Sequence, residues 1–193
     1  KIRDKLGGKL KISFVGGAAT PKDVLEFFEN INIKIVEGYG MSETSPMITL
    51  GSNEYPERKL GSVGRAIDNV DVKILLNDNE LENNKVGEIY VNGPNVMNSY
   101  KNEKDNENNF KLIDNKRYFK TGDTGYLDNE KRLYLVGREK EIYKLENGKF
   151  VTPDVIEQKL IMSKYIKQIM LYGENRPYNI AIVYPEYDNI NDN

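Results

Sequence analysis

The sequence predicts a mixed α/β protein with a β-rich middle region, and three observations support this prediction. Residues 10–37 read as a strand, a glycine turn, a helix and a second strand, which is the pattern of an α/β unit. Short β-type runs separated by Gly, Asn, Asp and Pro follow, and then a capped helix and two more strands. We therefore expect the end of a large α/β domain (1–58), a β-rich subdomain of that domain resembling a distorted barrel (59–138), and a hinge with the start of a truncated α+β domain (139–193).

The first α/β unit is predicted from its apolar runs and its capping residues. A strand is expected over residues 10–15, because LKISFV is largely apolar and then breaks at two glycines. A helix should follow with Thr20 as its N-cap and Pro21 at its first position. A second strand is expected over residues 31–37, ending in the turn EGYG. Both glycine turns would then follow strands, at the sheet edge where α/β proteins usually bind ligands.

The middle region is predicted to be a small β layer. Asp128-Asn129 fits a hairpin turn between strands at residues 126–127 and 133–136. The segment KNEKDNENN, residues 101–109, is polar and rich in asparagine, so we expect a mobile, solvated loop without function.

The last part begins with a charged segment after Arg138. Thr152 and Pro153 suit the start of a helix, and two strands are expected over residues 166–172 and 178–184. The change in composition places a domain boundary near residues 137–140.

Composition excludes several classes of function. The net charge of -2 and the pI near 5.5 lack the basic excess of nucleic-acid-binding proteins, so no nucleic-acid partner is expected. No apolar run is long enough to span a bilayer, and the absence of cysteine favours an intracellular setting. Without histidine or cysteine, the 193 residues cannot form a Ser-His-Asp triad, a thiolate nucleophile or a His-ligated metal site. Phosphate chemistry, which relies on hydroxyls, cations and a hard metal such as Mg²⁺, fits the residues that remain.

The stretch EGYGMSETS is the first candidate for ligand contact. Tyr39, between two glycines, has room to stack on a flat base. Ser42 can donate a hydrogen bond to a phosphate oxygen, and the Glu43 carboxylate can hold Mg²⁺ beside it. The same residues are also compatible with a simple helix start, in which Ser42 is the cap.

Two later positions could recognise a sugar or a phosphate. In TGD, residues 121–123, the Asp123 carboxylate could accept hydrogen bonds from both hydroxyls of a ribose. The same three residues are also typical of an ordinary turn that binds no ligand. Arg138 ends the run VGR, where its guanidinium could donate hydrogen bonds to a pair of hydroxyls or to a phosphate. The alternative is an arginine that faces solvent without binding a ligand.

Taken together, these motifs identify a family resemblance. EGYGMSE resembles the tyrosine-glycine-x-threonine-glutamate signature of the adenylate-forming, AMP-binding superfamily, which includes acyl-CoA synthetases, luciferases and peptide synthetase adenylation domains. Further runs fall where that superfamily carries its other motifs: FVGGAA, GSVGRAIDNVDVKI, GEIYVNGPNVMNSY, YFKTGDTGYL and LVGREKEIYKLENGKFVTPDVIE. The resemblance covers nearly the whole chain, and KLENGKFVTPDVIE looks most like long-chain fatty acyl-CoA synthetases.

The resemblance implies roles for particular residues. Ser42 would take the place of the family's threonine near the α-phosphate, Glu43 would be the Mg²⁺-associated carboxylate, and Lys144 would lie near the nucleotide or acyl intermediate. Lys140 would be the hinge about which the small domain rotates between the two half-reactions. The implied nucleotide contacts are Gly16, Gly17, Ala18, Glu37, Gly38, Tyr39, Gly40, Met41, Ser42, Asp123, Arg138 and Lys140.

The implied activity is that of a ligase. An ATP-dependent long-chain fatty acid:CoA ligase would use ATP, Mg²⁺ and coenzyme A, forming an acyl-adenylate and then a thioester. The alternatives are another carboxylic acid as substrate, or a non-catalytic nucleotide-binding or interaction module. Neither the family's phosphate loop nor its C-terminal catalytic lysine has a counterpart here, so we expect an inactive fragment of a longer enzyme. Peripheral association with an intracellular membrane and oligomeric state stay open.

Overall fold

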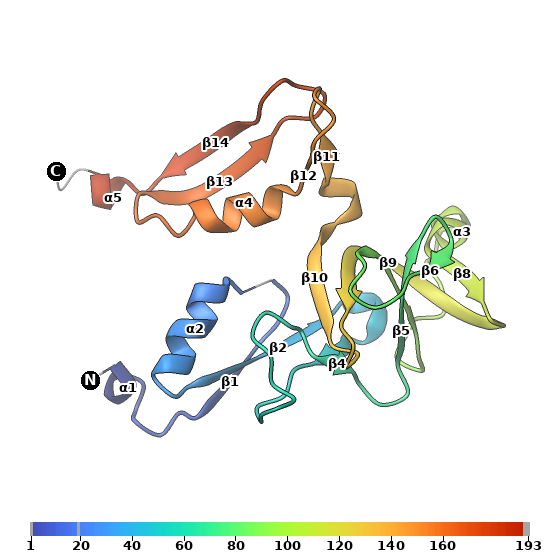
Figure 1. Cartoon of the computed structure of the whole chain (residues 1–193), viewed down its shortest axis with the longest axis horizontal. Helices are drawn as coiled ribbons and strands as arrows, with labels where there is room; N and C mark the ends of the chain where they lie inside the picture. Colours follow the sequence, from blue (N-terminus) through green and yellow to red (C-terminus); the bar gives the residue numbers. More distant parts are fainter. Residues whose placement is uncertain (1, 19, 191–193) are drawn as a thin grey trace. The chain divides into compact units, whose positions relative to one another are not determined.

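The structure, a computed structural model, describes residues 2–18 and 20–190, so Ala19 of the FVGGAA motif lies outside the described residues. The chain divides into two compact units, Lys1–Leu135 and Val136–Asn193, which we describe separately (Figure 1). Helices and strands alternate at the start of the chain and again at its end, so the predicted mixed α/β class is confirmed.

The α/β unit predicted at the start of the chain is present with shifted boundaries. It comprises α1 (Ile2–Lys5), β1 (Ile12–Val15), α2 (Lys22–Asn30) and β2 (Lys34–Gly40), and β1 is parallel to β2. The N-cap of α2 is Pro21, so the prediction that Thr20 caps this helix is wrong. The second strand starts three residues later than predicted, because residues 31–33 form the connection after α2, where the Ile33 amide donates to the Phe28 carbonyl. EGYG therefore belongs to a strand and not to a turn.

Two further strands complete the first sheet. β3 (Met47–Leu50) runs antiparallel to β2 and β4 (Arg65–Ala66) pairs with β3, giving the order β1-β2-β3-β4. The pairing of β2 with β3 shifts register between Tyr39 and Gly40, where a β-bulge forms. A Cβ atom at Gly40 would lie 1.7 Å from the Pro46 carbonyl oxygen, so this close approach of two backbones requires glycine.

The predicted β layer forms a larger sheet. It consists of β5 (Asp71–Leu76), β6 (Asn79–Glu80), β7 (Gly87–Asn92), β8 (Phe110–Ile113), β9 (Lys116–Leu127) and β10 (Leu133–Arg138). The order is β10-β9-β7-β5-β6, and β8 pairs with β9. As predicted, Asp128-Asn129 lies in the connection between β9 and β10, where the Asp128 carboxylate accepts from both the backbone and the side chain of Arg132. A bridge between Gly64 and Leu133 joins this sheet to the segment that leads into β4.

Apolar side chains from both sheets of the first unit share one core. Ile48 of β3, Ile89 and Val91 of β7, and Leu133 of β10 are fully buried in it. Tyr39 of β2 belongs to the same cluster and is only 7% exposed. Because burying a side chain of this size contributes about 1.5–3 kcal/mol, this core fixes the relative positions of the strands that carry the candidate site.

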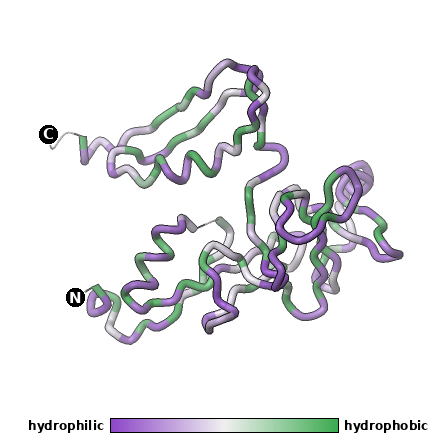
Figure 2. The backbone as a smooth tube through the Cα atoms, in the orientation of Figure 1, coloured by the Kyte–Doolittle hydropathy of each residue, from purple (hydrophilic) through white to green (hydrophobic). Residues whose placement is uncertain are grey.

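Residues 101–109 do not form the loop that we predicted. They contain the helix α3 (Glu103–Asn109), whose N-cap Asn102 accepts a hydrogen bond from the Lys104 backbone amide. The segment is hydrophilic throughout, as Figure 2 shows by its purple colour, and it has no apolar face from which a helix could be read. The cap and the acidic first turn stabilise the helix instead, so the prediction from composition was wrong.

The second unit packs a helix on a two-stranded sheet. Its elements are the 3₁₀ turn η2 (Glu139–Glu141), β11 (Tyr143–Lys144), β12 (Phe150–Val151), α4 (Pro153–Leu160), β13 (Ile166–Tyr172), β14 (Ile180–Pro185) and α5 (Tyr187–Ile190). The predicted helix start is confirmed, with Thr152 as N-cap and Pro153 at the first position. β13 matches its predicted range and β14 begins two residues later than predicted. Of the helices in the described part of the chain, none is long and apolar enough to cross a membrane.

Candidate nucleotide-binding site

The two glycine runs of the first unit lie against each other. A Cβ atom at Gly16 would be 3.1 Å from the Gly38 carbonyl oxygen, which places the turn after β1 directly beside β2. Gly17 has φ +86°, a left-handed conformation that favours glycine. Gly16, Gly17 and Ala18 are exposed, so their backbone is accessible to a ligand at this edge.

Tyr39 and Asp123 meet although they are 84 residues apart. The Tyr39 hydroxyl donates a hydrogen bond to Oδ2 of Asp123 at 2.6 Å. Because the Tyr39 side chain is almost fully buried, its hydroxyl holds this carboxylate from the core side. Stacking of the tyrosine ring on adenine stays a prediction.

A bulge in β9 aims Asp123 at Tyr39. Glu88 pairs with Thr124 and Tyr90 pairs with Lys120, so residues 121–123 lie opposite Ile89 alone. Gly122 has φ +79°. The Thr121 hydroxyl donates to the Ile89 carbonyl at 3.0 Å and accepts from the Asp123 amide at 3.1 Å, which satisfies backbone groups that the ladder would otherwise pair. The TGD run is therefore a bulge within a strand, and the alternative prediction of an ordinary turn is wrong. Bulges commonly redirect side chains at functional sites.

The residues after Tyr39 form a single 3₁₀ turn, η1 (Ser42–Thr44). Its N-cap is Met41, so the alternative interpretation in which Ser42 caps a helix is wrong. Thr44, which the sequence analysis did not select, is fully buried and stabilises the turn: its hydroxyl accepts from the Met41 amide at 3.2 Å and lies 3.0 Å from the Met41 carbonyl. Ser42 is left exposed, where its hydroxyl is accessible to a ligand.

Glu43 is the residue of this turn that suits a metal. Its carboxylate is half-buried, and Oε1 accepts a hydrogen bond from the Tyr100 hydroxyl at 2.8 Å. Among the described residues, no group of three or more Asp and Glu side chains is placed to hold a metal ion. A single carboxylate nevertheless fits Mg²⁺, which usually binds through one or two carboxylates together with the phosphates of its substrate.

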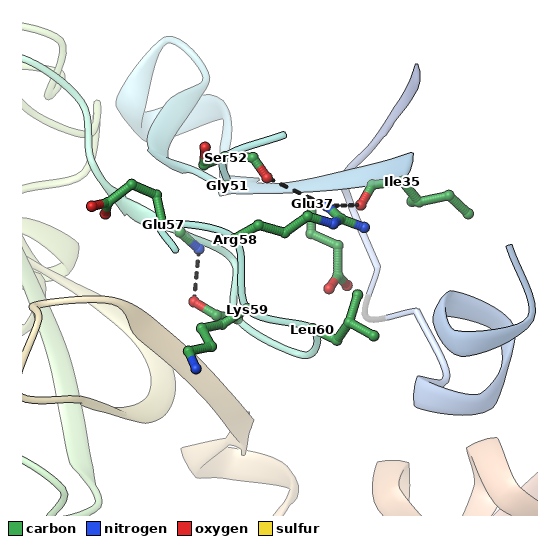
Figure 3. A pocket seen from close by; sticks show the side chains of 10 residues that line it. Ile35, Glu37, Gly51, Ser52, Glu57, Arg58, Lys59 and Leu60 are labelled. Carbon is green, nitrogen blue, oxygen red and sulfur yellow. Dashed lines mark hydrogen bonds between the residues drawn. The ribbon is translucent and has the colours of Figure 1, made fainter. Parts of the chain in front are cut away.

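Glu37 is buried beside Arg58 and not exposed at the strand edge. Both residues line a cavity of about 10 Å³, shown in Figure 3, which has room for roughly one water molecule and not for a nucleotide. Burial raises the pKa of the Glu37 carboxyl, and hydrogen bonds from the backbone and side chain of Thr20 oppose this shift. Thr20 thus supports Glu37 instead of capping α2.

The raised pKa of Glu37 has a consequence for stability. A carboxyl whose pKa is higher in the folded state than its usual value of 4.5 stabilises the fold below that pH, and this contribution is lost as the pH rises through the folded-state pKa. We expect Glu37→Gln to lower the free energy of unfolding more at pH 4 than at pH 7, relative to the unmodified chain. Urea unfolding at both pH values measures this difference, and a pH-independent difference would contradict the assignment.

A second concavity in the first unit does not include the predicted site residues. It measures about 410 Å³, a volume in the range of small-molecule pockets, and lies over β5 with Val72, Ile74 and Leu81 among its lining residues. The candidate site is therefore a set of side chains and backbone groups at the strand ends, outside this concavity.

The remaining predicted residues belong to the second unit. Arg138 ends β10 with its side chain largely exposed, 4.0 Å from the Glu141 carboxylate. Lys140 is exposed in η2, and the Lys144 ammonium of β11 lies 5.6 Å from the centre of the Phe150 ring. Their roles in binding and hinge motion stay predictions.

The first unit thus gathers exposed backbone, hydroxyls and two carboxylates where parallel strands of an α/β sheet end, an arrangement that suits a phosphorylated ligand. The profile of the AMP-binding enzyme family matches residues 1–101, just over half of the chain. The chain belongs to this family, and the resemblance to the adenylate-forming superfamily is confirmed.

Individual relatives span most of this chain. A 2-succinylbenzoate–CoA ligase of Bacillus licheniformis is 35% identical over 171 residues, covering 88% of this chain and 35% of the relative. The long-chain-fatty-acid–CoA ligase FadD15 of Mycobacterium bovis is 32% identical over 184 residues, covering 95% of this chain and 28% of the relative. The chain therefore spans about a third of the length of these relatives.

A solved structure supports the same fold. O-succinylbenzoate coenzyme A synthetase (MenE) from Bacillus subtilis, in complex with ATP and magnesium ion, matches with a TM-score of 0.79 and 28% identity, over 95% of this chain and 40% of that one. Relatives with two kinds of acid in their names match this chain at similar identity, so the identity values do not select one acid.

Proposed function

We propose that this chain forms the central and hinge portion of an AMP-forming ligase that activates a carboxylic acid with ATP and transfers the acyl group to coenzyme A. The observation that carries the proposal is the hydrogen bond between Tyr39 and Asp123, which brings together two motif residues that are distant in sequence. The neighbouring Glu43 provides the carboxylate that the chemistry needs beside the phosphates.

In the proposed reaction, the carboxylate of the acid attacks the α-phosphorus of ATP, pyrophosphate leaves, and a mixed anhydride with AMP forms. The thiol of coenzyme A then attacks the acyl carbon, a thioester forms, and AMP leaves. Mg²⁺, bound with the phosphates, supplies positive charge that offsets the charge of the crowded phosphate.

Each site residue has a place in this scheme. Asp123 accepts hydrogen bonds from the ribose hydroxyls, while the exposed Ser42 hydroxyl donates to an α-phosphate oxygen. The exposed backbone of residues 16–18 borders the adenine. Such fixed groups act by holding the reactants in line and by stabilising charge, so no histidine or cysteine is required.

We propose a long-chain fatty acid as the first candidate substrate, because the run KLENGKFVTPDVIE looks most like fatty acyl-CoA synthetases. A second candidate is an aromatic dicarboxylic acid such as 2-succinylbenzoate, because a ligase named for that acid is among the relatives that match this chain.

A product assay tests the proposal. The longest natural protein that contains these residues is incubated with ATP, Mg²⁺, coenzyme A and either palmitate or 2-succinylbenzoate, and AMP and the thioester are quantified by mass spectrometry. We expect AMP and palmitoyl-CoA in equal amounts, and no product from the isolated 193 residues. Product from 2-succinylbenzoate alone would support the second candidate. ATP binding without any product, across a panel of acids, would instead support a non-catalytic nucleotide-binding module.

A further inference from the structure

Tyr100 contacts the candidate metal-associated carboxylate from a distant part of the chain. Its hydroxyl donates to Oε1 of Glu43 at 2.8 Å, across 57 positions of sequence. Tyr100 ends the run GEIYVNGPNVMNSY, and its sequence context predicts no role for it.

The backbone of Tyr100 is fixed by α3. The Tyr100 amide donates to Oδ1 of Asn106 at 2.7 Å, and Nδ2 of Asn106 donates back to the Tyr100 carbonyl at 3.0 Å. A single amide side chain therefore satisfies both backbone groups of Tyr100. Residues 101–109, for which we predicted no function, therefore hold the backbone of Tyr100 in position through Asn106.

The ring of Tyr100 and the backbone of Glu43 are also held. The ring lies 6.3 Å from that of Phe119, centre to centre, and Phe119 is only 2% exposed in β9. The Met97 amide donates to the Glu43 carbonyl at 2.8 Å, so the segment before Tyr100 fixes the main chain of Glu43 while Tyr100 fixes its side chain. A glutamate without such partners would sample several rotamers about its side-chain torsions.

We propose that Tyr100 is a positioning residue that holds the Glu43 carboxylate in the orientation needed to bind Mg²⁺ with a nucleotide, and that Asn106 of α3 fixes Tyr100 for this purpose. This inference rests on the proposed role of Glu43. Groups that hydrogen-bond to a metal ligand orient it, and their loss typically weakens metal binding by about 10- to 100-fold.

The test uses Tyr100→Phe, which keeps the ring against Phe119 and removes only the hydroxyl. ATP binding to the longest natural protein that contains these residues is measured by calorimetry in Mg²⁺ and in EDTA, together with thermal unfolding. We expect affinity in Mg²⁺ to fall by about 10-fold, with affinity in EDTA and the melting temperature nearly unchanged. Asn106→Ala should produce a smaller loss that is likewise confined to Mg²⁺.

Tyr90→Phe is the matched control. Tyr90 also donates to a carboxylate, that of Glu88 at 3.1 Å. This side-chain bond has no part in the candidate site, so Tyr90→Phe should bind ATP as the unmodified protein does, both in Mg²⁺ and in EDTA.

The outcomes separate this inference from the proposed function. If Tyr100→Phe binds as the unmodified protein does in both media, or loses affinity equally in both, Tyr100 has no role in metal positioning and the inference is wrong while the function stands. If the unmodified protein itself shows no Mg²⁺-dependent ATP binding, the proposed function fails, and the inference with it.

Discussion

Replacing Asp123 by alanine should weaken ATP binding by about 10- to 100-fold, because hydrogen bonds to a charged group contribute roughly 1.5–3 kcal/mol. The carboxylate is fixed by the Tyr39 hydroxyl at 2.6 Å and by the bulge of β9, so it is already oriented before a ligand arrives. Preorganisation of this kind avoids the entropic cost of ordering the group on binding. Calorimetric titration with ATP measures the loss.

A second ligand shows whether the loss arises from the ribose. Wild type and Asp123→Ala are both titrated with 2′,3′-dideoxy-ATP, which lacks the two hydroxyls. If Asp123 accepts hydrogen bonds from them, the substitution should hardly change the affinity for this analogue. Equal weakening towards both ligands would indicate disruption of the site, and no weakening towards ATP would show that the ribose assignment is wrong.

Asp114→Ala serves as the control for charge. Asp114 also lies in the larger sheet region of the first unit, but its side chain is 76% exposed and pairs with Lys73 at 2.8 Å. Removing it changes the net charge as Asp123→Ala does, and we expect affinity for both nucleotides to stay within about twofold, because solvent and salt screen the charge of this exposed carboxylate.

Replacing Arg58 by alanine should lower the free energy of unfolding by about 1.5–3 kcal/mol, because hydrogen bonds that involve a charged group contribute roughly that much. Arg58 is 3% exposed and its Nη2 lies 2.6 Å from the Glu29 carboxylate. Its Nη1 also donates to the carbonyls of Ile35 and Ser52, at 2.9 and 3.3 Å (Figure 3). One guanidinium thus connects α2, β2 and the segment after β3. Urea unfolding monitored by circular dichroism measures the loss.

Lys22→Ala is the matched control for this effect. Lys22 forms an ion pair with Glu26 on the same helix at 3.4 Å, but the two side chains are 73% and 50% exposed. Its removal should change stability by less than about 0.5 kcal/mol. A comparable loss in both variants would show that burial does not determine the contribution of Arg58.

The pH dependence gives an independent check on Arg58. The hydrogen bond that the Arg58 guanidinium donates to the Glu29 carboxylate lowers the pKa of Glu29 below the usual value of 4.5. A carboxyl with a lowered folded-state pKa stabilises the fold above its usual pKa, and this contribution is lost as the pH falls through the folded-state value. Unfolding free energy should therefore decline below pH 4.5 in the unmodified chain, and less steeply in Arg58→Ala.

The differences between prediction and structure have local physical causes. A threonine followed by a proline correctly predicted the start of α4, where Pro153 follows the cap. The same pair at Thr20 and Pro21 predicted the start of α2 one residue too early, because Pro21 itself is the cap. Thr20 hydrogen-bonds Glu37 instead, a partner that lies on another element. The helix α3 was missed because its stabilising groups are capping side chains, which leave no apolar periodicity.

Motifs, caps and apolar alternation are local properties of the chain, so the family resemblance, the mixed α/β class and the polar groups available for phosphate chemistry can be predicted from the residues alone. Which of those groups meet depends on the folded chain. Tyr39 reaches Asp123, Tyr100 reaches Glu43 and Arg58 reaches Glu29 across 84, 57 and 29 positions of sequence. Such contacts depend on strand pairing, on a bulge and on a shared core, and no local preference of the residues involved encodes them.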